Sequence, residues 1–193
     1  MLFRSMNEEQ FKRSAALLSN FKPRSEITLD EIPAPQKLAK FAYALSADVS
    51  NGLIGDAEKE LANGRFVILH EPGGQDTWEG EFRCVTYLNA DLETTEAEDP
   101  SLPEHGWNWL LKALADNRCQ FAAPSGTVTR SMSHSFGKLS TASDGGEIEI
   151  RASWSPIINK PEDLIGHLEA WCNLLAEISY LRSEEHTSEL QSH

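Results

Sequence analysis

Residues 147–155 alternate strictly between apolar and polar side chains, and this alternation constrains the fold more than any other feature of the chain. Successive side chains of a β-strand point to opposite faces, so a period of two predicts a strand with one buried face and one face in water. The buried face would comprise Ile148, Ile150, Ala152 and Trp154, and the solvated face Glu147, Glu149, Arg151 and Ser153.

Strand patterns also occur in four other segments, each an alternating or short apolar run bounded by turn-forming residues. The pair Asn51-Gly52 predicts a turn, and the proline and glycines of 72–74 predict a break. Residues 20–37 hold three prolines, so we expect an extended segment along the surface there. The four strand segments are 41–49, 64–72, 80–92 and 119–137.

Helical spacing of apolar residues appears in three segments. Asn7 and Gln10 form a capping-box pattern before the first, and Ser101 and Glu104 repeat this pattern before the second. The third helix follows Pro161, and its apolar stripe either packs on the sheet, as we favour, or forms a homodimer seam. The helical segments are 8–19, 101–117 and the residues after 161, and the last stripe comprises Leu164, Leu168, Trp171, Leu175 and Ile178.

These elements predict a single α+β domain over residues 7–181, in the order α-β-β-β-α-β-β-α. We expect an antiparallel sheet of about five strands covered by three helices, because an amphipathic helix and a half-buried sheet bury their apolar faces against each other.

The charge balance excludes one large class of function. The 193 residues include 17 Lys and Arg against 30 Asp and Glu, a net charge of −13, so we expect no nucleic-acid partner. No stretch approaches the roughly 18 apolar residues that a membrane span requires, so we expect a soluble, unexported protein. Three widely spaced cysteines, Cys84, Cys119 and Cys172, predict reduced thiols in the cytoplasm.

The last twelve residues, RSEEHTSELQSH, look like the in-frame translation of a short-read sequencing adapter. We therefore treat 182–193 as a non-native tail, as one would a tag. Without it the chain keeps 16 basic and 27 acidic residues, so the acidic character does not depend on the tail.

The chain lacks the local motifs of common catalytic and cofactor sites. It has no GxxxxGK[ST], GxGxxG, HExxH or GxSxG, so we expect no cofactor and no metal, and catalytic residues cannot be assigned. His70, Glu71 and Asp76 could shuttle protons or chelate a metal, but without a second histidine at ligand spacing a solvated turn is the better interpretation.

Cationic side chains give the best candidate for a ligand site. Arg130 and His134 share one side of the strand at 119–137 with apolar residues, so packing of that side would bury them partly, where they need an anionic partner. A structural ion pair at the rim of the strand is the simpler interpretation. The full candidate set for an anionic ligand is Arg83, Arg130, His134 and Arg151.

Two of the five tryptophans do not fit the expected core positions. Trp78 falls in a polar loop, and Trp109 lies off the main stripe of its helix. Exposed tryptophans are common anchors of protein interfaces, so both are candidates for binding a partner. Packing of each along a neighbouring element is an equally good interpretation.

Several ordered blocks of sequence resemble the actinobacterial domain of unknown function 3000 family. The resemblance implies an actinobacterial, cytoplasmic protein and carries no catalytic residues, because the family has no assigned activity. The element order is also similar to secretion-chaperone and YbjN-like α+β folds, whose members bind other proteins. The blocks are EIPAPQKLAKFAYALSADV (31–49), GRFVILHEPGGQDTWEGEFRCVTYLNADLE (64–93), LPEHGWNWL (102–110), GTVTRSMSHSFGKL (126–139), EIEIRASW (147–154) and HLEAWCNLL (167–175).

Together these observations favour a non-enzymatic protein-binding or adaptor domain that uses its sheet face and exposed aromatic residues. The alternative is a binder of, or an enzyme acting on, a small anionic ligand held by the arginine and histidine cluster.

Overall fold

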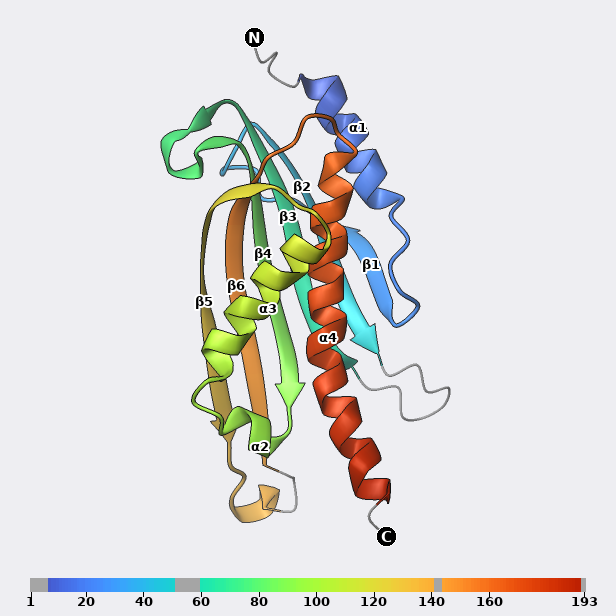
Figure 1. Cartoon of the computed structure of the whole chain (residues 1–193), viewed down its shortest axis with the longest axis vertical. Coiled ribbons are helices and arrows are strands. Elements are labelled where there is room, and N and C mark those ends of the chain that lie inside the picture. The colour runs from blue at the N-terminus through green and yellow to red at the C-terminus, as the bar shows by residue number, and fades with distance from the viewer. Residues whose placement is uncertain (1–6, 51–59, 141–143, 192–193) are drawn as a thin grey trace.

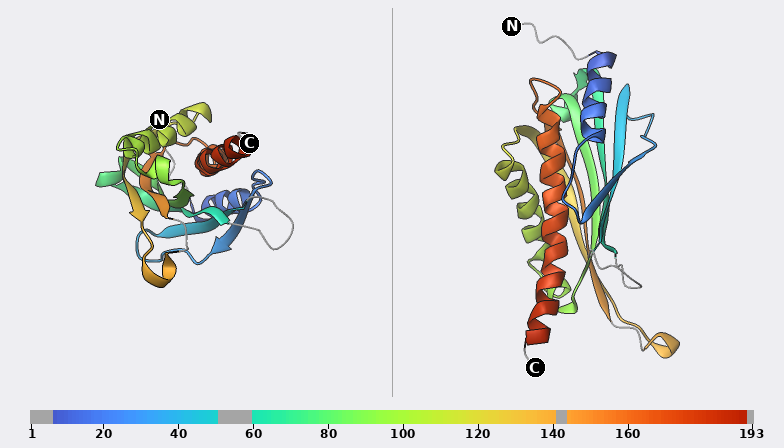
Figure 2. Two further views of the ribbon diagram at one scale, coloured as in Figure 1. Left: turned by 90° about the horizontal axis from the view of Figure 1, so that it is seen from below. Right: turned by 90° about the vertical axis from the view of Figure 1, so that its right-hand side faces the viewer.

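The computed structural model describes residues 7–50, 60–140 and 144–191. For residues 180–191 it describes the backbone only. The described chain forms one six-stranded antiparallel sheet in the order β1-β2-β3-β4-β6-β5. All the described α-helices lie on the same side of this sheet (Figures 1 and 2). The strands are β1 Ile27–Ile32, β2 Phe41–Ser50, β3 Glu60–Gln75, β4 Gly80–Leu92, β5 Phe121–Ser133 and β6 Gly145–Pro156. The helices are α1 Glu8–Ser19, α2 Thr94–Ala97, α3 Leu102–Asp116 and α4 Asp163–Gln191, with 3-10 turns η1 Asp76–Trp78 and η2 Gly137–Leu139.

The predicted α+β class is confirmed, with one strand more than expected. The segment 20–37 is not only a surface wrap, because its middle part is the edge strand β1. Ile27 is buried and pairs with Val49 of β2, and the strand ends just before Pro33, which lacks the backbone N–H that a ladder needs. The expected turn at 51–52 lies outside the described residues.

The helix starts show which capping prediction holds. The Asn7 side chain accepts from the backbone N–H of Gln10, and the Gln10 side chain accepts in return from the N–H of Asn7, so the first capping box is confirmed. The second is wrong, because Ser101 makes no side-chain cap bond and instead donates its N–H to Asp99. The acidic segment between β4 and α3 contains the short helix α2.

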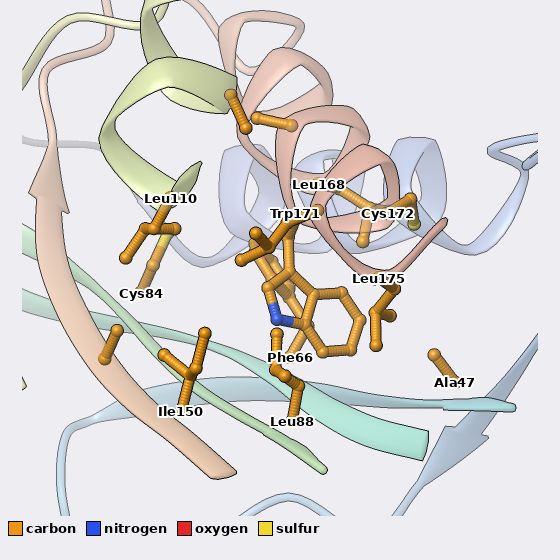
Figure 3. Close-up of a cluster of buried hydrophobic side chains, with 14 of the residues drawn as sticks. Ala47, Phe66, Cys84, Leu88, Leu110, Ile150, Leu168, Trp171, Cys172 and Leu175 are labelled. Atoms are coloured by element: carbon orange, nitrogen blue, oxygen red, sulfur yellow. The ribbon is translucent and has the colours of Figure 1, made fainter. Parts of the chain in front are cut away.

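The core lies between the sheet and α4 (Figure 3). The apolar stripe of α4, including Trp171 and Leu175, is completely buried against the protein's own sheet. Trp171 packs beside Phe66 over Gly64, where an added Cβ would come within 2.7 Å of the indole. Trp154 Nε1 donates to Nδ1 of His167 at 3.0 Å, and burial lowers the pKa of His167 to about 4. No described helix is long and apolar enough to cross a bilayer.

Candidate functional site

The face of the sheet opposite the helices carries the candidate site. No described α-helix covers this open face, as the edge-on view shows (Figure 2). Strand pairing aligns side chains into rows across it, because residues opposite each other in neighbouring strands point the same way. One row, here named the cationic row, runs through Arg65 of β3, Tyr87 of β4 and Arg151 of β6.

The two arginines of the cationic row have different surroundings. Arg151 lies 5.2 Å over the Tyr87 ring and donates from Nε to Glu149 at 2.6 Å, and this hydrogen bond raises the pKa of the guanidinium. Arg65 is exposed, and no described side chain forms an ion pair with it. With Asn63 and the backbone of Gly64, these residues line a shallow hollow of about 480 Å³. An anionic group could therefore bind between the two arginines.

The rows on either side of the cationic row differ in character. Toward one end of the sheet, Val67 lies opposite Val85, and both side chains are partly exposed. Toward the other end, the next row holds Asp48, Asn63 and Glu149, and burial together with nearby carboxylates raises the pKa of Asp48. The open face thus changes from apolar to cationic to acidic along the strands.

Arg83 also lies on the open face, but its side chain is used up in hydrogen bonds that stabilise the fold. It is buried and donates four hydrogen bonds, to the carbonyl of Ala123 and to three serine hydroxyls, at 2.8 to 3.1 Å. Burial lowers the pKa of its guanidinium, which nevertheless stays charged. Arg83 therefore ties β4 to β5 and β6 and has little capacity left for a ligand. The three serines are Ser125, Ser153 and Ser155.

The other two residues of the candidate cluster lie elsewhere. Arg130 points to the helix side and donates to the carbonyl of Ala97 in α2. His134 follows the end of β5 and pairs with Asp144 at 2.9 Å. Both are exposed, so the simpler interpretation, a structural pair at the rim of the strand, holds for His134, and the alternative of partial burial does not. β5 is an edge strand with no neighbour on its outer side among the described residues. Of the four candidate residues, only Arg83 and Arg151 share the open face. They lie on neighbouring strands and are offset by four residues, about 13 Å along the strand direction.

The two tryptophans proposed as anchors are not equivalent. Trp78 is only 8% exposed, so of its two interpretations packing along a neighbouring element is confirmed and exposure is wrong. The 3-10 turn η1 packs against β4 and β5, and the Trp78 carbonyl accepts a hydrogen bond from the hydroxyl of Ser155, which lies on the open face. Trp109 is partly exposed, packs against the edge of the core and lies 6.2 Å from the ring of His105.

His70 also differs from its predicted place in a solvated turn. It is fully buried and stacks on Phe82 at 4.3 Å, and burial lowers its pKa. Its Nε2 lies 3.6 Å from Glu81. Burial also raises the pKa of Cys84 well above its ordinary value, that of Cys119 to about 11 and that of Cys172 to about 12. The thiols are therefore protonated and poor nucleophiles. Among the described residues no group of three His, Cys, Asp or Glu side chains is arranged to hold a metal.

Arg65 is the residue of this site that the sequence analysis missed. Its position between Gly64 and Phe66 already indicated the face opposite the core, by the same alternation that placed Arg151. Recognising the pair required knowing that β3 and β6 both flank β4, which local patterns do not contain.

Comparison with known proteins assigns the chain to a family without adding an activity. Residues 7–187 match the family described as "Protein of unknown function (DUF3000)". No curated protein and no solved structure matches the chain. Since the match covers most of the sequence, the chain belongs to the DUF3000 family.

Proposed function

We propose that this protein is a non-enzymatic, cytoplasmic binding domain that binds an acidic segment of a partner protein on the open face of its sheet. The observation that carries the proposal is the cationic row, in which Arg65 and Arg151 flank Tyr87 on a face without a covering helix. Tyrosine and arginine are, with tryptophan, the residues enriched among the energetically dominant positions of protein interfaces.

The charge of the chain supports an acidic partner segment. With a net charge of −13, most of the surface repels acidic groups, so an acidic segment gains attraction mainly where arginines cluster. Arg65 has no counter-ion among the described side chains, so its guanidinium N–H groups can donate to a carboxylate. Val67 and Val85 lie beside the cationic row, so we expect an apolar residue next to the acidic one in the partner.

A small anionic ligand is the second candidate, and the hollow of about 480 Å³ favours it. Arg65 and Arg151 stand on either side of one strand, with Cα atoms about 10 Å apart, so both guanidinium groups could reach one anion. This candidate replaces the set of Arg83, Arg130, His134 and Arg151, because those four side chains do not lie together.

The test is a pull-down from actinobacterial extract with wild-type protein and the double variant Arg65→Glu/Arg151→Glu. The control variant Lys12→Glu/Arg118→Glu makes the same total change in charge at exposed positions away from the open face. The acidic segment of any captured protein is then synthesised and titrated against each variant. Inorganic phosphate is titrated in parallel, with amide chemical shifts as the readout.

The proposal predicts a protein captured by wild type and by the control variant but not by the double variant. Its acidic segment should bind wild type at least tenfold more tightly than the double variant, a difference of about 1.4 kcal/mol. A partner that binds both variants equally would overturn the assignment of this face. Shifts at Arg65 and Arg151 with phosphate, in the absence of any captured protein, would replace the adaptor function by the ligand function.

A further inference from the structure

The two edges of the sheet are built differently. At one edge, β1 has only six residues, carries Asp30 and Glu31 and is followed at once by Pro33. Short length, charge and proline are the usual devices that prevent an edge strand from pairing with another chain. At the other edge, β5 has thirteen residues and pairs only with β6 in the described part of the chain.

The outer strand β5 has such devices only in its first residues, where Pro124 and a bulge lie. From Ser125 to Ser133 it contains no proline, lysine or acidic residue. Its one charged side chain, Arg130, is held by the carbonyl of Ala97 on the helix side. A bulge between Ala122 and Ser125 disturbs only the start of the strand, and beyond it the pairing with β6 is continuous. A long, regular edge with open backbone groups is a template for an added strand.

The side chains of β5 define which strand would fit. On the helix side, Val128 and Met132 are only partly buried, and Trp107 of α3 lies over Gly126. On the open face the strand shows only hydroxyl groups, and all five residues are exposed. An added strand should therefore alternate between apolar side chains and uncharged polar ones. The hydroxyl positions are Ser125, Thr127, Thr129, Ser131 and Ser133.

We propose that the added strand is β5 of a second copy of this chain, paired antiparallel to form a continuous sheet across a homodimer. β5 itself has the alternation that it requires of a partner, with Arg130 as the one exception. If Thr129 lies opposite its copy, Thr127 lies opposite Ser131 and Val128 opposite Arg130, so no like charges meet.

Charge also selects this edge for self-association. Two copies of a chain with net charge −13 repel each other, and the repulsion is least where acidic side chains are absent. β5 is the only described strand without a carboxylate. The pairing of one strand with its copy buries less surface than a standard interface, so we expect a weak dimer, with a Kd of about 1–100 µM.

The test is sedimentation equilibrium of the full chain from about 1 to 300 µM, a range chosen to span this Kd. Thr129→Lys places two lysines together at the centre of the proposed pairing, and Thr129→Glu does the same with two glutamates. Thr28→Lys is the matched control, an exposed threonine on the open face of the other edge strand. Circular dichroism confirms that each variant is folded.

We expect wild type and Thr28→Lys to dimerise alike and each Thr129 variant to dimerise at least tenfold more weakly. An equimolar mixture of Thr129→Lys and Thr129→Glu should recover a heterodimer, because opposite charges then face each other. A wild-type chain that stays monomeric at 300 µM would overturn the proposal. A dimer that Thr129→Lys leaves intact would overturn it too, since that dimer would use another surface.

Discussion

Replacing Arg83 by methionine tests whether this buried arginine stabilises the fold or serves a ligand. Its side chain donates four hydrogen bonds that join three strands. Each hydrogen bond contributes about 0.5–1.5 kcal/mol net, so the four together contribute about 2–6 kcal/mol. Methionine removes the cost of burying a charge and fills most of the space, which offsets part of the loss. We expect the free energy of unfolding to fall by about 3 kcal/mol.

The assay is urea unfolding followed by tryptophan fluorescence, with thermal unfolding as a second measurement. For a chain of this size, 1 kcal/mol corresponds to about 2–4 °C, so Tm should fall by about 6–12 °C. Arg65→Met is the matched control, because it makes the same chemical change at an exposed position of the same face, and we expect it to cost less than about 0.5 kcal/mol. Equal stability of the two variants would refute the structural role of Arg83.

Three further predictions concern other parts of the molecule. Gly64→Ala should lower stability by about 1–3 kcal/mol, measured by urea unfolding, because its Cβ would collide with the backbone carbonyl of Tyr87 and with the indole of Trp171. In the folded state His167 stays neutral down to pH about 4, whereas in the unfolded state it binds a proton below pH 6.5. The free energy of unfolding should therefore fall by about 3 kcal/mol as the pH drops from 6.5 to 4. His167→Gln should flatten this pH dependence, measured by urea unfolding at several pH values. The hydrogen bond from His134 lowers the pKa of Asp144, so His134→Ala should return that pKa toward 3.8 in an NMR titration.

Local alternation predicted the central strands well and the edge strand β1 poorly. The segment 80–92 matches β4 residue for residue, because residues that are buried in the core recur at every second position from Phe82 to Leu92, and all of them except Thr86 are apolar. β1 escaped prediction because only Ile27 and Leu29 of its six residues are apolar and face the core, and prolines stand on both sides of the segment. A strand so short is specified by its pairing with β2 rather than by its own pattern.

Arg83 and Arg151 show why the alternation of side chains along a strand could not by itself separate a structural arginine from a candidate binding residue. In the register of β4 and β6, both arginines alternate onto the same side and therefore share the open face. What differs is the nearby 3-10 turn η1, which covers the face near Ser155 and leaves Arg151 in solvent. That turn depends on the left-handed Glu79 (φ 57°) and on contacts with β5, which follows forty residues later in the chain. Only the assembled sheet distinguishes the two arginines.

The meaning of the β5 sequence likewise depends on its place in the sheet. An alternation of hydroxyl and mainly apolar side chains, without carboxylates, would suit a central strand with neighbours on both sides, where no protection is needed. The same residues at an edge leave backbone groups and partly buried apolar side chains without a neighbour. β1, at the opposite edge, carries two carboxylates and is followed by a proline, whereas β5 has neither a carboxylate nor a proline from Ser125 to Ser133, so the two edges of one protein differ. Pairing with a second copy would give β5 the surroundings that its sequence already fits.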